Sequence, residues 1–184
     1  MSEDHTSKLI DKNDRRLALV IVDVQKKFIR KGEDPTLVSA ERHTPTMRKA
    51  IEMFREAGRP VIWVLYEGDP LLEGITMETR SLLDGFEIAD TDHVVIKYHM
   101  NSFNNTNLSD VILQNGCDSA LLMGMFAQYC VMATYWGAFD RDVVPYMLKD
   151  GLISTDDKFC DLAYAMCKSY TLEELESNLK LHRM

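Results

Sequence analysis

The sequence has no excess of positive charge and no long apolar run. Its formal net charge is −8 and its pI is about 5.1, whereas nucleic acids and anionic membrane surfaces attract proteins with a basic face. No apolar stretch approaches the roughly 20 residues that a membrane-spanning helix needs. Residues 1–15 form a polar extension that lacks the apolar stretch of a secretory signal. We therefore predict a cytoplasmic protein without nucleic-acid or membrane partners.

The sequence also lacks the cysteine patterns of disulfide-rich or zinc-finger proteins and the glycine-rich loops of nucleotide-binding proteins. The four cysteines, Cys117, Cys130, Cys160 and Cys167, include no C-x-x-C pair, which argues against a disulfide framework or a zinc finger. The chain has no G-x-G-x-x-G and no G-x-x-x-x-G-K segment, so it lacks the glycine-rich loops that bind nucleotide phosphates. We predict four free thiols and no cofactor.

Strand and helix patterns alternate along the 184 residues, which predicts one α/β domain spanning residues 1–184. Buried strands are predicted at 17–24, 61–66, 93–97, 119–124 and 143–148, where apolar residues run almost continuously. Helices are predicted at 44–57, 106–115, 129–140 and 156–168, with a further helical piece after Thr171. The fold class is a three-layer sandwich, with a mostly parallel sheet of five to six strands and helices on both faces.

Capping and breaking residues set the expected boundaries. Thr44 is the expected N-cap of the first helix, with Pro45 at its first position, and Thr171 with Glu174 forms a capping box. Pro145 weakens the fifth strand or places it near an edge. Little room remains between Cys167 and Thr171 for a sixth strand.

Three chemically active residues fall where predicted parallel strands end. Asp23 closes the first strand, Lys97 closes the third, and Cys130 follows the fourth, where a helix begins. Ligands of open α/β sheets bind at this edge, so the three side chains are expected to converge there. From spacing alone the alternatives stay open: a small buried cysteine, a capping aspartate and a surface lysine would give the same pattern.

Three segments resemble the isochorismatase-like superfamily of cysteine hydrolases, which includes nicotinamidases and N-carbamoylsarcosine amidohydrolase. The resemblance extends from about residue 16 to residue 175. The segment LALVIVDVQKKF resembles the family's D-x-Q-x-x-F motif, VVIKYHMNSFNNTNL its lysine segment and GMFAQYCVMATYWGA its nucleophile segment. The matching residues in these segments are Asp23, Gln25, Phe28, Lys97, Phe103, Thr106, Leu108, Gly124, Cys130, Val131, Thr134 and Ala138.

The resemblance implies a catalytic triad of Asp23, Lys97 and Cys130. Asp23 would take the thiol proton while Cys130 attacks a carbonyl, and a thioester would form and then be hydrolysed. The backbone N–H groups of Phe126 and Cys130 would form the oxyanion hole, after a cis peptide between Met125 and Phe126. We expect Lys97 and the start of the helix to favour the thiolate.

The metal-binding segment of nicotinamidases is not matched. Glu67 and Asp69 stand before Pro70 where those enzymes have Asp and His, and no His follows until His93. Because zinc and iron sites normally include His, we predict no metal site and treat Glu67 and Asp69 as polar loop residues. His93 and His99 are expected to be structural or surface residues.

Gln25 and several aromatic residues are the candidates for a substrate pocket. Trp63 is assigned to the core. The predicted lining residues are Gln25, Phe28, Tyr66, Phe103, Tyr129 and Tyr135, with Phe126 beside them. Such a lining suits a small, partly planar carboxamide, ureide or carbamoyl compound.

Two other functions remain open at this stage. One is isochorismatase-type hydrolysis of a vinyl ether, in which Cys130 is incidental, and the other is a non-catalytic binding protein. A homo-oligomer, a dimer or larger, is predicted from the family, with Tyr135, Trp136 and Phe139 as the expected contact surface.

Overall fold

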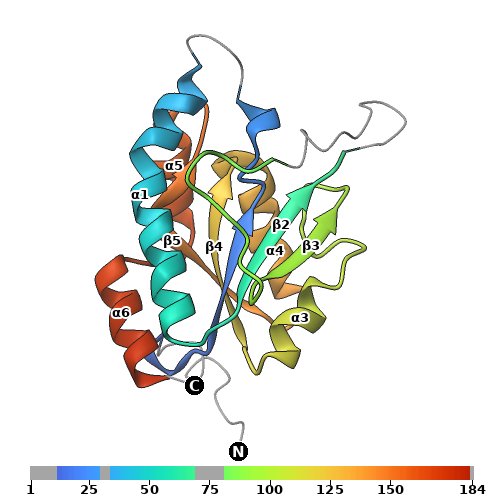
Figure 1. Cartoon of the computed structure of the whole chain (residues 1–184), viewed down its shortest axis with the longest axis vertical. Helices are drawn as coiled ribbons and strands as arrows, with labels where there is room; N and C mark the ends of the chain where they lie inside the picture. The colour runs from blue at the N-terminus through green and yellow to red at the C-terminus, as the bar shows by residue number, and fades with distance from the viewer. Residues whose placement is uncertain (1–11, 30–33, 69–80, 183–184) are drawn as a thin grey trace, which may run out of the picture.

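The computed structural model describes residues 12–29, 34–68 and 81–182, and its centre is a parallel sheet (Figure 1). The strands run in the order β3-β2-β1-β4-β5-β6 and all neighbouring pairs are parallel. They are β1 (Leu17–Val22), β2 (Val61–Tyr66), β3 (His93–Lys97), β4 (Ser119–Met125), β5 (Val144–Ile153) and β6 (Ser169–Tyr170). The predicted fold class is confirmed, and the sixth strand forms as a two-residue strand.

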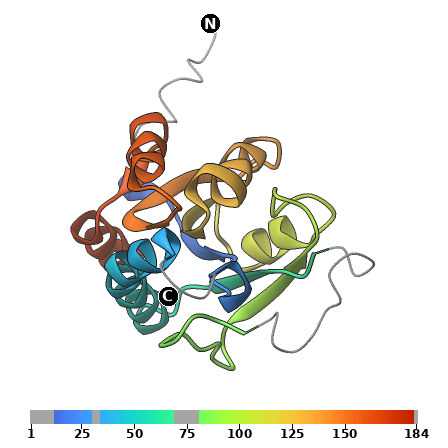
Figure 2. The same ribbon diagram turned by 90° about the horizontal axis from the view of Figure 1, so that it is seen from above.

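Helices cover both faces of the sheet, as Figure 2 shows. They are α1 (Pro35–Glu56), α3 (Leu108–Gln114), α4 (Met132–Phe139), α5 (Asp157–Met166) and α6 (Leu172–Leu181), with a π-helical turn (Ala127–Val131) before α4 and short 3-10 turns at Lys12–Asp14 and Lys26–Phe28. Alternate residues of β1 point to opposite faces. Leu19 and Ile21 pack with residues of α1 and α6, whereas Val20 and Val22 pack with residues of α3, α4 and α5.

Helix α1 begins earlier than predicted. Asp34 is the N-cap, because its side chain accepts a hydrogen bond from Thr36 N at 2.9 Å, and Thr44 and Pro45 lie inside the helix. A proline within a helix removes one hydrogen bond and costs about 3 kcal/mol. The buried face nevertheless continues past Pro45 at helical spacing, through Thr36, Ser39, Ala40, His43, Met47, Ala50, Ile51 and Phe54. Burial of this face explains why the helix does not break at Pro45.

Other boundaries follow the sequence closely. The capping box of α6 is confirmed, since Thr171 Oγ1 accepts from Glu174 N at 3.2 Å and Glu174 Oε2 accepts from Thr171 N at 2.9 Å. Strand β5 extends to Ile153, beyond the prediction, after an irregularity where its pairing with β4 shifts register. Pro145 lies outside the pairing with β6, which involves Met147 and Leu148. The pairing of β5 with β6 therefore does not need the backbone N–H that Pro145 lacks.

The outer surface of α4 carries two half-exposed aromatic side chains. Trp136 and Phe139 are 47% and 50% exposed, whereas Tyr135 is buried. Tyr135 therefore does not belong to the contact surface expected from the sequence, and the homo-oligomer stays a prediction. Among the described residues, no helix has the length and apolar character to cross a membrane.

Candidate active site

The sheet brings Asp23, Lys97 and Cys130 to one edge. Val22, the residue before Asp23, lies between Val64 of β2 and Gly124 of β4 in the strand register. Lys97 is the last residue of β3 and pairs with Tyr66. Cys130 lies in the π-helical turn that follows β4. Parallel strands end at the same edge, so residues more than 100 positions apart become neighbours.

A buried ion pair forms the centre of this group. Lys97 Nζ lies 2.7 Å from Asp23 Oδ2, and the two side chains are 0% and 1% exposed. Lys97 Nζ also donates a hydrogen bond to the Met100 carbonyl at 3.0 Å. The half-buried Cys130 thiol lies close enough to both groups for the Asp23 charge to raise its pKa and the Lys97 charge to lower it. The structure therefore brings together a thiol, a carboxylate and an ammonium group.

The backbone conformation of Asp23 is fixed by hydrogen bonds on both sides of the residue. Asp23 has a φ of 55°, in the left-handed region that Asp tolerates better than most residues. Its N–H donates to the Val64 carbonyl at 2.9 Å, and its carbonyl accepts from Gln25 N at 2.7 Å. Gln25 is fully buried, and its side-chain amide makes two hydrogen bonds with the backbone of Tyr66. Gln25 Nε2 donates to the Tyr66 carbonyl at 3.1 Å, and Gln25 Oε1 accepts from the Tyr66 N–H at 2.8 Å. Gln25 thus ties the segment after β1 to the end of β2.

Gly124 allows the chain to reach Cys130. Its φ is 123°, and a Cβ at this position would lie 2.1 Å from the Val22 carbonyl oxygen. Only glycine fits this close approach. The peptide between Met125 and Phe126 is cis, as the resemblance implies. The π-helical turn then begins, with Val131 N–H donating to the Phe126 carbonyl at 3.3 Å.

Burial sets the protonation of the site. It raises the pKa of Asp23 above its ordinary value, against the opposing effect of Lys97. It also raises the pKa of the Cys130 thiol to about 12, an effect that the Asp23 charge strengthens and Lys97 opposes. Lys97 lowers the pKa of Cys130, as expected, but desolvation and the nearby Asp23 carboxylate outweigh its effect.

Four aromatic side chains form a connected group beside the ion pair. The Phe28 ring lies 6.0 Å from Tyr66 and 5.8 Å from Phe126, and Phe126 lies 6.4 Å from Tyr129. Lys97 Nζ is 5.8 Å from the Tyr66 ring centre. Tyr129 is 52% exposed, so this group extends from the ion pair to the surface.

Similarity to known proteins places the chain in a family. The family model of the Isochorismatase domain matches residues 17–177. The chain belongs to the isochorismatase family. It is 25% identical over 146 residues to an isochorismatase family protein of Bacillus subtilis, covering 75% of this chain and 78% of that protein. It is 24% identical over 149 residues to a probable inactive nicotinamidase of Arabidopsis thaliana, covering 70% of this chain and 75% of that protein.

A solved structure agrees with this assignment. The crystal structure of N-carbamoylsarcosine amidase from Thermoplasma acidophilum matches with a TM-score of 0.72 and 26% sequence identity, covering 85% of this chain and 95% of that chain. The isochorismatase family consists mainly of hydrolases, and this chain has the fold of that family.

Phe103 and Tyr135 lie elsewhere in this isochorismatase fold. Both are buried in the core between the sheet and α3, α4 and α5. The Tyr135 hydroxyl accepts a hydrogen bond from Lys168 N at 3.0 Å, and its ring contacts Trp136 and Phe139. The structure therefore does not group them with Phe28, Tyr66 and Tyr129, the other predicted lining aromatics. Trp63 is fully buried and donates to Asp92 Oδ2 at 2.8 Å, which confirms its place in the core.

Two further residues near the site had weak signals in the sequence. Lys27 follows Asp23 by four positions, and its Nζ lies 4.6 Å from the Tyr66 ring centre, where its charge opposes the rise in the Asp23 pKa. Glu67 is buried and accepts from the Tyr98 hydroxyl at 3.2 Å. Asp69, its predicted companion, lies outside the described residues.

Proposed function

We propose that this isochorismatase-family chain hydrolyses a C–N bond in a small amide, ureide or carbamoyl compound, with Cys130 as the nucleophile. The observation that carries the proposal is the cluster itself. A thiol lies within reach of a carboxylate that has a raised pKa and is held by an ammonium group at 2.7 Å. This arrangement is a nucleophile with an adjacent base and an orienting cation.

The raised pKa values support general-base activation of Cys130 at the moment of attack. The Cys130 thiol keeps its proton in the free protein, because its pKa is about 12. Asp23 takes that proton as Sγ attacks the carbonyl carbon, and the raised pKa of Asp23 makes it a stronger base than an exposed carboxylate. Lys97 holds Asp23 in place throughout and balances the negative charge.

The remaining steps return the site to its starting state. The oxyanion formed on attack is stabilised by the backbone N–H groups of Phe126 and Cys130. Asp23 passes the proton to the leaving nitrogen as the C–N bond breaks, which leaves a thioester on Cys130. Asp23 then accepts a proton from water, whose oxygen attacks the thioester. Asp23 returns this proton to the Cys130 sulfur as the C–S bond breaks, which releases the acid and restores the thiol.

The aromatic group fits a small, partly planar substrate. Phe28, Tyr66, Phe126 and Tyr129 present ring surfaces next to the ion pair. Planar amides and ureides stack on such surfaces. Phe103 and Tyr135 are not part of this aromatic group, because both are buried in the core.

Turnover of a compound panel tests the proposal. Wild type, Cys130→Ala and Cys167→Ser are incubated with carboxamides, ureides and N-carbamoyl amino acids while ammonia or amine release is followed. We expect wild type and Cys167→Ser to be active and Cys130→Ala to be inactive, with an acyl adduct on Cys130 detected by mass spectrometry.

Isochorismate belongs in the same panel. Its hydrolysis at equal rates by wild type and Cys130→Ala would replace the proposal with ether hydrolysis. A lack of turnover with every compound would favour a non-catalytic binding protein; one relative is described as a probable inactive nicotinamidase.

A further inference from the structure

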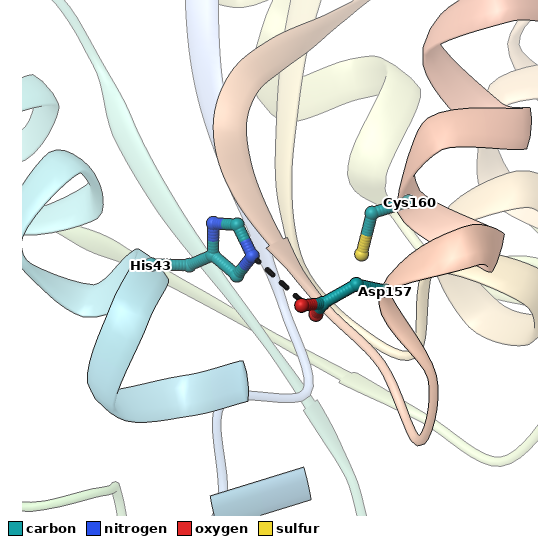
Figure 3. Close-up of side chains that lie close together, drawn as sticks. All are labelled: His43, Asp157 and Cys160. Carbon is teal, nitrogen blue, oxygen red and sulfur yellow. Dashed lines mark ion pairs between the residues drawn. The ribbon is translucent and has the colours of Figure 1, made fainter. Parts of the chain in front are cut away.

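A second cluster of chemically active side chains lies between α1 and α5, outside the candidate active site (Figure 3). His43 comes from α1, and Asp157 and Cys160 come from one face of α5, three positions apart. Their donor atoms, an imidazole nitrogen, a carboxylate oxygen and a thiol sulfur, all lie within 4.8 Å of one another. His43 is separated from the other two by more than 100 residues of sequence.

The His43 ring is oriented toward the other two side chains. Its Nδ1 lies 3.2 Å from the Asp150 carbonyl oxygen and acts as the donor there. In this tautomer Nε2 carries the lone pair, and it faces Asp157 Oδ1 at 3.9 Å. The His43 residue is 6% exposed, and Nε2 has no hydrogen-bond partner among the described residues. A buried nitrogen with a free lone pair points to a missing ligand.

The two partner residues are arranged to match. Arg42 pairs with Asp157 Oδ2, which leaves Oδ1 directed at His43. Cys160 is 2% exposed, and its free thiol donates a hydrogen bond to the Leu152 carbonyl at 3.5 Å, which it would give up on losing its proton to a metal. Metal-binding histidines and carboxylates are commonly held by such outer hydrogen bonds, as His43 is by Asp150 and Asp157 is by Arg42.

We propose that His43 Nε2, Asp157 Oδ1 and Cys160 Sγ bind one zinc ion, which joins α1 to α5. Nitrogen, sulfur and oxygen donors are the ligands of zinc, at about 2.0 to 2.3 Å, which places donors of a tetrahedral site about 3.5 Å apart. The donors would therefore close by about 1 Å on binding. Calcium and magnesium prefer oxygen ligands and do not suit a thiol and an imidazole. A fourth position is left for water.

The cluster is less suited to act as a Cys-His nucleophile. Such a pair needs a thiol that a substrate can reach. Here Cys160 is almost fully buried. A surface groove of about 620 Å³, lined by residues that include Ser39, Asp156 and Asp157, borders the cluster at Asp157.

Cobalt and zinc titrations of the full-length protein, after treatment with a chelator, test the proposal. We expect one equivalent of zinc to bind in competition with a chromogenic chelator. Cobalt should give a thiolate-to-metal charge-transfer band and the visible bands of a tetrahedral site. Cys160→Ser should abolish the charge-transfer band, and His43→Gln should weaken zinc binding by about 100-fold. Cys167→Ser, which changes another buried thiol in the same way, is the matched control and should retain both signals.

A measurement on the wild type covers the case in which a variant does not fold. Zinc should raise the midpoint of thermal unfolding by about 5 °C and should protect Cys160 from maleimide in mild denaturant. Absence of stoichiometric zinc binding and of this protection would overturn the proposal. So would a charge-transfer band that survives in Cys160→Ser and disappears in Cys130→Ala, because that result would place the metal at the candidate active site.

Discussion

The candidate active site and the cluster between α1 and α5 each contain one cysteine and one aspartate, but their third residues differ. At the sheet edge the third member is Lys97, whose ammonium lies 2.7 Å from Asp23 and has no lone pair to offer a metal. Between α1 and α5 it is His43, whose Nε2 has a lone pair and no hydrogen-bond partner among the described residues. The first cluster therefore already contains its cation, whereas the second is arranged to accept one.

The thiols of both clusters are protonated in the free protein for the same reason. Burial raises the pKa of Cys130 to about 12 and that of Cys160 to about 11. The two sites differ in how the proton can leave. Asp23 can accept it from Cys130 during attack on a substrate, whereas Cys160 would lose it to solvent when a metal binds. One thiol is suited to catalysis and the other to coordination.

The largest effect should come from removing one thiol at a time. Cys130→Ala is expected to lower kcat by about 10⁴-fold or more, because the covalent route is lost. Its zinc affinity should be unchanged. Steady-state kinetics with the best compound of the panel and the chelator competition assay measure the two properties. If Cys130→Ala loses zinc affinity as well as turnover, the two clusters are not independent.

Removal of the cation from the first cluster should cost stability. Lys97→Met leaves the buried Asp23 carboxylate without its partner, and loss of one member of a buried pair commonly costs about 3–5 kcal/mol of unfolding free energy. Urea denaturation at pH 8 measures the loss.

The same variant should be less destabilised at pH 5. The pKa of Asp23 is already raised in wild type, and removal of Lys97 raises it further, so Asp23 can become neutral as the pH falls. Equal destabilisation at pH 5 and pH 8 would show that the loss comes from packing of the lysine stem rather than from charge.

The pH profile of turnover should report Asp23. A general base must be ionised to accept the thiol proton, so kcat/KM should fall as the pH drops through the pKa of Asp23, by about tenfold per pH unit. Because burial raises this pKa, the midpoint should lie above the ordinary value of 3.8. Rates measured from pH 4 to pH 8, corrected for unfolding by circular dichroism, give the midpoint. A rate independent of pH over this range would contradict the role of Asp23 as base.

The first cluster was predictable from the sequence and the second was not. Asp23, Lys97 and Cys130 each follow or end a recognisable strand, and parallel strands end at one edge, so order along the chain implies proximity. His43 lies before Pro45, where the sequence suggested that a helix had not yet begun, and its partners lie on a helix more than 100 residues away. No local pattern connects them.

Burial was the other property that the sequence could not supply. Phe103 and Tyr135 were predicted to line the substrate pocket, yet both are core residues in the structure. The effect of Lys97 on the Cys130 pKa was expected from sequence, but the larger opposing effect of burial was not, because it depends on how completely the folded chain excludes water from the site.

The smallest effect should come from the ion pair of the second cluster. Arg42 and Asp157 are 58% and 41% exposed, and exposed pairs contribute about 0–1 kcal/mol to stability. Arg42→Met should therefore change the unfolding free energy of the metal-free protein by less than about 1 kcal/mol, in contrast to Lys97→Met. The same variant should bind zinc about tenfold more weakly than wild type, because Asp157 loses the group that orients it. A large stability loss without zinc would mean that Arg42 is structural, and unchanged zinc affinity would mean that Asp157 needs no support to coordinate the ion.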